Sequence, residues 1–343
     1  MLGTFEFSTE RFLKAKPRKL LIPALWLVLL IIFIRAAINH STSRAAAVGG
    51  SWVNSSSDLP HMGIGDGLPA SKSKKQPPTA NITTSDKVAV IIETRQSGSI
   101  VPVILHFSAV LGPTWPIIIY TPAENFGSFS TSAALLRHQR SGRITIRPLA
   151  EGVYFWDWNS VSAFLTTRWL WDDLAPAEHI LMFQSDSMLC ANAARSVEEF
   201  FEYDFIGAPI DPQYGAGYNG GLSMRSRKTT LRVLEAFDWL KGNRWAEDQW
   251  FYSKLKELQE QDIEEGIENG INLPSMEIAR TFAVETIDHP YPLGMWTPVD
   301  LAAAEITDFI IGLHQPTRFL HSHMVSLDEW CPEYKMATME RIQ

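Results

Sequence analysis

The chain has 343 residues, 45% of them hydrophobic and 20% charged, which excludes a disordered protein as a whole and indicates one large core or two small ones. Its net charge of −8 is uneven, because residues 1–85 carry +6 and residues 86–343 carry −14. A region that acidic binds nucleic acid poorly, so we expect no nucleic-acid partner.

The two cysteines, Cys190 and Cys331, are too few for a disulfide scaffold or a cysteine zinc site. In an oxidising compartment they could form one disulfide, and their separation in the sequence does not decide whether they do.

The N-terminal segment predicts a membrane anchor. The apolar run LLIPALWLVLLIIFI, residues 20–34, follows a basic segment, and few basic residues come after it. The positive-inside rule then makes 1–19 a cytoplasmic tail and 20–38 a transmembrane signal anchor, with the rest lumenal. The anchor is short, which suits the thin membranes of the early secretory pathway, so we expect a single-pass type II protein of the Golgi or ER. A signal peptide cleaved within RAAAVGG, residues 44–50, is the alternative.

Residues 39–86 predict a disordered stem, because they are rich in Ser, Gly, Pro, Lys and Ala and have no hydrophobic period. Asn54 and Asn81 begin N-glycosylation patterns, which have a use only in the lumen. We therefore expect the folded domain to span 87–343.

The folded part alternates β-branched apolar segments with amphipathic ones. This order predicts an α/β domain with a mainly parallel sheet covered by helices on both faces, and in such sheets ligands bind at the carboxyl ends of the strands. No G-x-G-x-x-G follows the first strand, which argues against a nicotinamide or flavin enzyme. The predicted strands are 88–92, 117–120, 143–149, 179–184 and 204–210, and the predicted helices are 99–111, 133–139, 161–168, 194–201, 229–239 and one beginning at Glu247.

Polar residues follow two of these strands. Glu93 and Arg95 end the first strand, and Asp186 ends the fourth, in HILMFQSDSMLC. The glycine-rich stretch YGAGYNGGLSMRS, residues 214–226, permits close approach of backbone to a ligand. Plainer interpretations stay open for each feature: an internal ion pair, an Asx turn at the strand end, and a glycine turn.

Six segments in order carry a family resemblance: VIIETR, LMFQSDSMLC, YDFIGAPI, YNGGLSMRS, AEDQWF and LPSMEIARTFAVE. From about Val88 to the C-terminus the chain resembles domain-of-unknown-function family 5672, a glycosyltransferase-like family. With its anchor and stem it also resembles Golgi-type glycosyltransferases of the GT-A fold. The resemblance implies transfer of a sugar from a nucleotide-sugar donor to a glycan or glycoprotein acceptor, assisted by Mn²⁺ or Mg²⁺.

The resemblance also implies roles for the acidic residues. Asp186 stands where such enzymes usually have an Asp-x-Asp metal site, but Ser185 and Ser187 flank it and the second aspartate is missing. A hard cation held there by carboxylate oxygen would neutralise the leaving diphosphate. Asp248 or Glu247 would accept the proton of the acceptor hydroxyl, and we favour Asp248. Acidic residues in a first helical turn also stabilise the helix dipole, which is the plainer explanation for this pair.

The remaining implied residues bind substrates. Asn219, Gly220 and Gly221 would line the donor sugar and the acceptor. Glu93 and Arg95 would contact the nucleotide base or phosphate.

The last implied ligand, a histidine after a Pro-x-Gly turn, is displaced in this chain. Trp296 stands at the expected position in HPYPLGMWTP, and His314 follows about 18 residues later in LHQPTRFL. Residues 295–312 are therefore either a surface insertion, which loops tolerate at modest entropic cost, or a short intron retained in frame. We take His314 as the candidate metal or phosphate ligand.

Two other classes of protein remain possible. A catalytically silent, membrane-anchored protein that binds a glycan or nucleotide-sugar could keep this fold after losing the second aspartate. A metal-dependent hydrolase is disfavoured, because no close-spaced set of His and Asp ligands occurs in the sequence.

Overall fold

The computed structural model describes residues 84–95, 98–242, 245–285, 311–316, 328 and 331–338. The predicted tail, 1–19, and anchor, 20–38, lie outside these residues, as does the predicted stem up to residue 83. Within the described ranges, no helix combines the length and the apolar character needed to cross a membrane.

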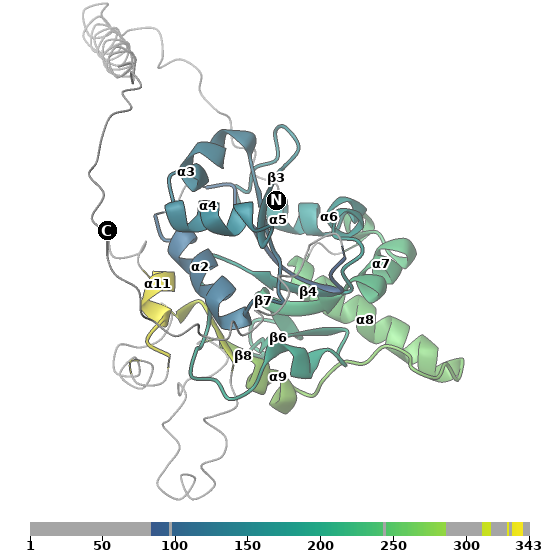
Figure 1. The fold of residues 1–343 in the computed structure, drawn as a ribbon. Helices are drawn as coiled ribbons and strands as arrows, with labels where there is room; N and C mark the ends of the chain where they lie inside the picture. Colours follow the sequence, from purple (N-terminus) through teal and green to yellow (C-terminus); the bar gives the residue numbers. More distant parts are fainter. Residues whose placement is uncertain are drawn as a thin grey trace, which may run out of the picture. The chain divides into compact units, whose positions relative to one another are not determined.

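The domain is built on a six-stranded sheet in the order β3-β2-β1-β4-β7-β6 (Figure 1). Neighbours among the first four strands are parallel, whereas β7 runs antiparallel to both β4 and β6. The expected mixed α/β architecture with a mostly parallel sheet is confirmed. The strands are β1 (Lys87–Ile92), β2 (Ile117–Thr121), β3 (Ile144–Pro148), β4 (His179–Phe183), β6 (Phe205–Pro209) and β7 (Tyr218–Ser226).

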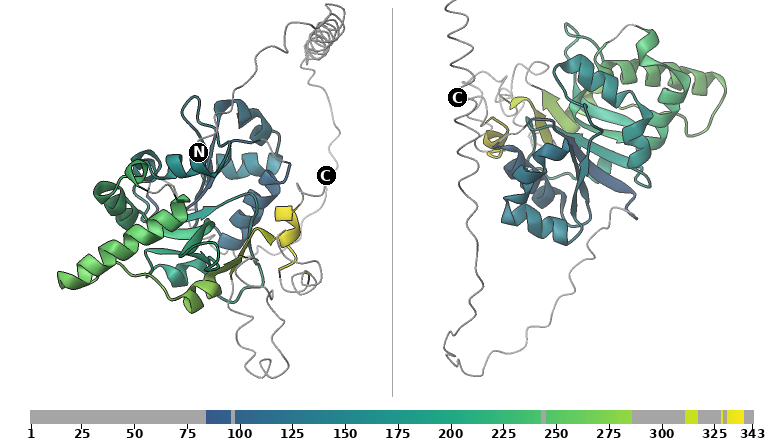
Figure 2. Two further views of the ribbon diagram at one scale, coloured as in Figure 1. Left: turned by 180° about the vertical axis from the view of Figure 1, so that it is seen from behind. Right: turned by 90° about the horizontal axis from the view of Figure 1, so that it is seen from above.

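Helices cover both faces of this sheet (Figure 2). Strand β1 shows why, because its alternating side chains enter two separate cores. Ala89 packs in the core with Phe107 of α2, and Val90 packs in the other core with Trp171 of α6. The helices are α2 (Ile100–Leu111), α3 (Phe126–Ser130), α4 (Ala133–Arg140), α5 (Trp158–Leu165), α6 (Arg168–Asp173), α7 (Arg227–Ala236), α8 (Glu247–Glu264), α9 (Met276–Phe282) and α11 (Tyr334–Thr338), with 3₁₀ turns η1 (Ala123–Asn125), η2 (Val197–Phe200) and η3 (Trp239–Lys241).

Side-chain caps determine where two helices next to the candidate site begin. Asp157 and Ser160 form a reciprocal capping box at the start of α5. Ser226 ends β7 and at once caps α7, because its hydroxyl accepts a hydrogen bond from the N–H of Thr229. Caps of this kind each stabilise a helix by about 1 kcal/mol. They therefore help to hold the ends of the strands at fixed positions.

Three predicted elements differ from the structure. The predicted helix at 194–201 is only the 3₁₀ turn η2, in which Val197 and Phe200 are three residues apart and share one buried face. The predicted helix at 161–168 is two helices, since α5 ends before the cap Thr166 and α6 begins after Thr167. The glycine-rich stretch is mostly the strand β7, because its backbone pairs with two neighbours and is buried.

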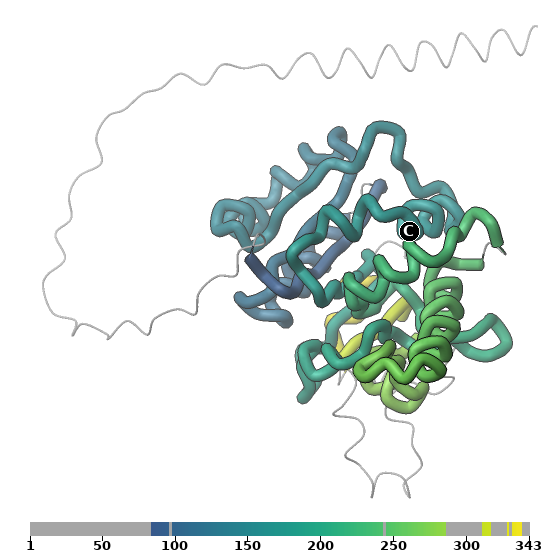
Figure 3. The backbone as a smooth tube through the Cα atoms, turned by 90° about the vertical axis from the view of Figure 1, so that its right-hand side faces the viewer, coloured from purple at the N-terminus to yellow at the C-terminus, as the bar shows by residue number. Residues whose placement is uncertain are grey.

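A second, three-stranded sheet joins distant parts of the chain in the order β5-β9-β8. It consists of β5 (Ser187–Leu189), β9 (Gly312–His314) and β8 (Ala283–Glu285), and Figure 3 shows the yellow segments near the C-terminus returning to the middle of the domain. Residues 295–310 of the predicted insertion lie outside the described residues, so the choice between insertion and retained intron stays a prediction.

The two cysteines form a disulfide, Cys190–Cys331, with an S–S distance of 2.06 Å. Cys190 directly follows β5, and its N–H also donates to the carbonyl of Ile311 at 3.0 Å. The bond thus ties the segment that carries α11 to the strand that follows Asp186. It closes a loop of 141 residues, a long-range link that the sequence alone left open.

Replacing Cys331 with Ala should lower the free energy of unfolding by about 2–5 kcal/mol, because the unfolded chain loses the constraint of a closed loop. Urea unfolding of the oxidised protein, with and without dithiothreitol, measures this effect. Reductant should destabilise the wild type and leave the variant unchanged. Equal stability of the two proteins under oxidising conditions would refute a structural role for the bond.

Candidate active site

The predicted metal residues Asp186 and His314 meet where the two sheets join. Strand β9 pairs with β5 so that His314 lies opposite Ser187, and the N–H of Gln315 donates to the Asp186 carbonyl at 2.9 Å. This register places His314 Nε2 3.9 Å from Asp186 Oδ1. The imidazole is 2% exposed and the carboxylate 20%, so the carboxylate is the more accessible of the two groups.

A third carboxylate, Glu285, lies behind the imidazole. Its Oε1 is 3.7 Å from His314 Nδ1, and its Oε2 accepts a hydrogen bond from the amide of Asn219 at 3.2 Å. The side-chain oxygen of Asn219 in turn accepts from the N–H of Gly221 at 2.8 Å. Asn219 therefore ties Glu285 to the glycine strand and is placed to support the site from behind.

Two adjacent glycines of β7 leave room on opposite faces of the strand. A Cβ at Gly220 would lie 2.6 Å from side-chain atoms of both Arg225 and Glu247. A Cβ at Gly221 would overlap the imidazole of His314. Any side chain at either position would displace one half of the site, so the close approach that the glycines permit is between protein groups.

Glu247 forms a buried ion pair with Arg225. Both carboxylate oxygens accept from the guanidinium, at 2.8 and 2.9 Å. The guanidinium also lies over the rings of Phe205, Phe251 and Trp171, with centroids 4.7, 5.4 and 5.8 Å away. Aromatic faces stabilise a cation, and the bidentate pair is the strong form of a carboxylate–guanidinium contact. Both carboxylate oxygens of Glu247 are therefore engaged in this ion pair.

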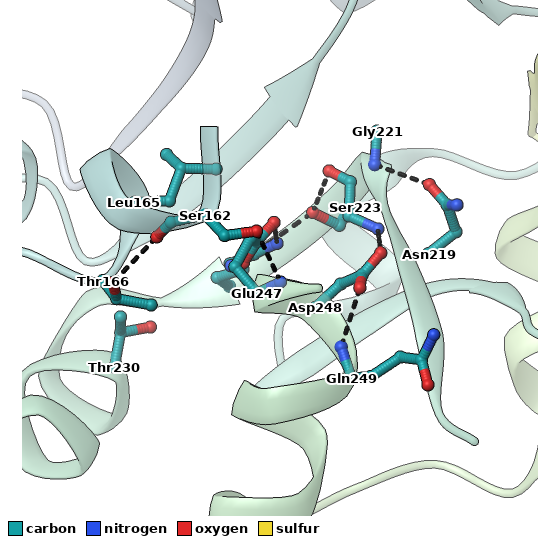
Figure 4. Close-up of polar contacts among 12 residues, drawn as sticks. Ser162, Leu165, Thr166, Asn219, Gly221, Ser223, Thr230, Glu247, Asp248 and Gln249 are labelled. Carbon is teal, nitrogen blue, oxygen red and sulfur yellow. Dashed lines mark hydrogen bonds and ion pairs between the residues drawn. The ribbon is translucent and has the colours of Figure 1, made fainter. Parts of the chain in front are cut away.

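Asp248 lies next to this pair and has a different environment (Figure 4). Its Oδ2 accepts from the N–H of Gly220 at 3.0 Å, and its Oδ1 accepts from the N–H of Gln249 at 2.7 Å. The pKa of the Asp248 carboxyl is raised to about 6, chiefly by burial and then by the neighbouring Glu247 carboxylate. The two N–H donors and Arg225 oppose that rise. A carboxyl that titrates near neutral pH is suited to general-base work.

Glu93 and Arg95 form the internal ion pair that the sequence left open, with a distance of 3.0 Å between Arg95 Nε and Glu93 Oε1. The Ser185 hydroxyl also donates to Glu93, at 3.4 Å. The Arg95 side chain is 71% exposed, so its guanidinium can still meet a ligand. All three residues line a pocket of about 250 Å³ that also reaches Asp186 and Gly220. The other lining residues are Ile92, Phe155, Trp156, Asp157, Val161, Leu165, Met182, Phe183 and Gln184.

The residues at Asp186 fit a divalent cation. Two ligands that hold one ion at about 2.1 Å lie at most about 4.2 Å apart, and the 3.9 Å separation of Asp186 and His314 falls within this limit. His314 Nδ1 is buried and has no hydrogen-bond partner among the described residues, but it faces Glu285. A carboxylate behind a histidine is the usual support for a metal ligand. The described residues contain no group of three or more His, Cys, Asp or Glu side chains arranged to hold a metal, so further ligands would come from substrate and water.

The structure thus brings every predicted site residue to one edge of the sheet. Two residues that contact the predicted site residues, Glu285 and Arg225, were not assigned a role from the sequence. Glu285 ends the segment LPSMEIARTFAVE and Arg225 lies in YNGGLSMRS, so both stood within motifs whose neighbours were considered. Neither could be placed, because the contacts that give them a role join residues far apart in the chain.

The fold and the site define the class of protein: a mixed α/β domain with a mostly parallel sheet and an acidic site at the carboxyl ends of its strands. Residues 143–295 match the family described as "Protein of unknown function (DUF5672)", which confirms the predicted family resemblance over that part of the chain. The first of the six motifs, at 90–95, precedes the matched range. No curated protein matches this sequence.

Among solved structures, the chain is similar to a mannosyltransferase, PcManGT from Pyrobaculum calidifontis, in complex with GDP-Man and Mn²⁺, with 12% identity and a TM-score of 0.36 over 60% of this chain. It is also similar to the glycosyltransferase GlyE of Streptococcus pneumoniae TIGR4 in its apo form, with 12% identity and a TM-score of 0.40 over 68% of this chain. The chain covers 65% of the first protein and 55% of the second, less than two thirds of either.

The two neighbouring carboxylates should differ sharply when each is neutralised. Glu247→Gln leaves the buried Arg225 without a counter-charge and should cost about 3–5 kcal/mol of stability. Asp248→Asn should leave stability at pH 7.5 unchanged or higher. Because the folded pKa of Asp248 lies above its unfolded value, ionising it opposes folding, by about 3 kcal/mol. The wild type should therefore lose this stability as pH rises from about 4 to about 6.

Urea unfolding of both variants across pH 4–8 measures these effects. Similar losses from the two substitutions would contradict the assignment of Glu247 to structure and Asp248 to chemistry.

Proposed function

We propose that this protein is a GT-A-like glycosyltransferase that moves a sugar from a nucleotide-sugar donor to a glycan or glycoprotein acceptor. The observation that carries the proposal is the assembly of the Asp186–His314 pair and Asp248 on either side of the glycines 220–221. The Asp186–His314 pair is suited to hold a cation that binds a diphosphate, and Asp248 is suited to accept a proton. Sugar transfer from a nucleoside diphosphate needs both.

The pocket at the ends of β1 and β4 would hold the donor. The exposed guanidinium of Arg95 offers charge-assisted hydrogen bonds to phosphate, and the rings of Phe155 and Trp156 offer flat apolar surface to a base. Asp186 and His314 would hold Mn²⁺ or Mg²⁺, which when bound neutralises charge on the leaving diphosphate. Glu285 orients the imidazole from behind.

In the transfer, the acceptor hydroxyl oxygen forms a bond to the anomeric carbon of the donor sugar. The bond from that carbon to the diphosphate oxygen breaks, and the electron pair leaves with the nucleoside diphosphate. Asp248 accepts the hydroxyl proton. Two backbone N–H donors hold the Asp248 carboxylate in place, so this carboxylate is already oriented when the acceptor sugar binds.

We further propose that the chain is a type II membrane protein of the Golgi or ER, anchored by residues 20–38, with its catalytic domain in the lumen. The Cys190–Cys331 disulfide is in keeping with that placement, because disulfides persist in oxidising compartments.

The full-length protein, incubated with Mn²⁺ and a panel of nucleotide-sugars, should release the nucleotide of one donor. Asp186→Ala should abolish this release because the cation loses its carboxylate ligand, and activity that persists in that variant would refute the metal assignment. Isothermal titration of the same donors identifies the alternative. Donor binding with no release in the wild type would indicate a catalytically silent nucleotide-sugar-binding protein.

Transfer activity should fall as pH drops through about 6, because a general base works only when ionised and the Asp248 pKa lies there. Asp248→Asn should lower kcat by about 10²–10⁴-fold with little change in the donor KM. The pH dependence of kcat/KM for the wild type and for Asp248→Glu measures the acidic limb. A profile that is flat from pH 5 to pH 8 would exclude Asp248 as the base.

A further inference from the structure

A second pocket lies at the start of α8, where Ala246 and Gln249 line it. It has a volume of about 800 Å³, which is within the range of roughly 300–1,000 Å³ typical of small-molecule sites. Four aromatic residues line it: Tyr252 of α8, which is partly buried, and three exposed ones, Trp158 at the start of α5, Tyr214 before β7, and Trp245 before α8. Their exposed fractions are 54%, 58% and 51%, so about half of each side chain faces solvent.

The backbone that carries these exposed rings is held by specific contacts. The Gln249 side chain donates to the Tyr214 carbonyl at 3.3 Å, and the Trp239 indole donates to the Trp245 carbonyl at 3.0 Å. Gly215 has φ +145°, and any Cβ there would overlap Gln249, so this glycine lets the Tyr214 segment lie directly against α8. Exposed aromatic surface on a rigid backbone is a common feature of binding sites.

Asp248 is hydrogen-bonded to one lining residue of each pocket. Its Oδ2 accepts from the N–H of Gly220, a residue that lines the donor pocket, and its Oδ1 accepts from the N–H of Gln249, a residue that lines the aromatic pocket. The start of α5 is a second link, because its cap Asp157 lines one pocket and its first residue Trp158 lines the other. A proton acceptor for sugar transfer must lie close to both donor and acceptor, and these contacts place Asp248 beside the walls of both pockets.

We propose that the pocket lined by Trp158, Tyr214 and Trp245 is the acceptor subsite and that it binds a neutral glycan. This inference rests on the proposed function, because it takes Asp248 as the proton acceptor. A pyranose ring presents C–H groups on one face, which pack on an aromatic ring, while its hydroxyl groups hydrogen-bond at the edges. Gln249 and Ser253 supply polar groups of that kind at the pocket wall.

The charge of the lining favours a neutral sugar over a nucleotide. Among the described residues that line the aromatic pocket, Lys256 is the one that is charged, whereas the donor pocket carries Arg95, Glu93 and Asp186. A diphosphate would thus find its cationic and metal-binding partners in the donor pocket. The aromatic pocket offers mainly ring surface, which suits an uncharged saccharide.

The test uses the full chain, purified in a detergent without a sugar headgroup, and the single variants Trp158→Ala, Tyr214→Ala and Trp245→Ala. Trp169→Phe is the matched control, because Trp169 is 42% exposed but lines neither pocket. Tryptophan fluorescence is titrated with mannotriose, cellotriose and N-acetylchitotriose. At least one trisaccharide should bind the wild type and the control alike, and the tryptophan-to-alanine variants should bind it at least tenfold more weakly.

With the donor identified, the same three variants should raise the acceptor KM at least tenfold and leave the donor KM unchanged. Trisaccharide binding that is absent from the wild type, or unchanged in the three variants, would overturn the inference. If the protein turns over a donor but the three variants keep the wild-type acceptor KM, the acceptor-site inference is overturned and the proposed function stands. Glycan binding that depends on these rings, without turnover of any donor, would refute the proposed enzyme and retain the glycan site.

Discussion

The candidate site depends on two adjacent positions in β7 that have no side chain. Consecutive residues of a strand face opposite sides, so Gly220 opens space for the Arg225–Glu247 pair and Asp248 while Gly221 opens space for His314. Strand β7 therefore separates Asp248 and the Arg225–Glu247 pair from His314 by backbone alone at these two positions. Because β7 pairs with both β4 and β6, this backbone is held within the sheet.

Two neighbouring carboxylates acquire different properties from their surroundings. Glu247 faces a guanidinium enclosed by aromatic rings, and its charge is matched there. Among the residues that the structure describes, Asp248, one residue on, forms no such ion pair. Burial and the charge of Glu247 raise its pKa, and two backbone N–H groups keep it in place. Separate environments for adjacent acids are a general way to divide structural and chemical roles. Here the division follows from the first turn of α8, which points the Glu247 side chain to Arg225 and leaves Asp248 against the backbone N–H of Gly220.

Local patterns in the sequence were enough for much of this architecture. The apolar runs at 88–92, 117–120 and 179–184 predicted three strands of a mainly parallel sheet, because apolar runs of that length bounded by polar residues form buried strands. The rule that ligands bind at strand ends then led to Glu93 and Asp186. The failures arose where tertiary pairing overrides local preference. Glycines weaken an isolated strand, and a glycine turn was the plainer interpretation of the stretch around residue 219, but hydrogen bonds to β4 and β6 make it a nine-residue strand.

By itself, the sequence indicated the alternation of strands and helices and the candidate Asp186, because periodicity and strand ends are local properties of the chain. Asp248 was a candidate only through the family resemblance of AEDQWF. Only the tertiary structure decided which groups surround them. His314 reaches Asp186 through the pairing of β5 with β9, Glu285 supports His314 through β8, and Arg225 takes Glu247 as its partner. The spacing of Cys190 and Cys331 in the sequence likewise did not decide whether they are bonded, and the fold brings them together as a disulfide. These contacts join residues separated by tens to more than a hundred positions, and local sequence carries no record of which distant segments will pair.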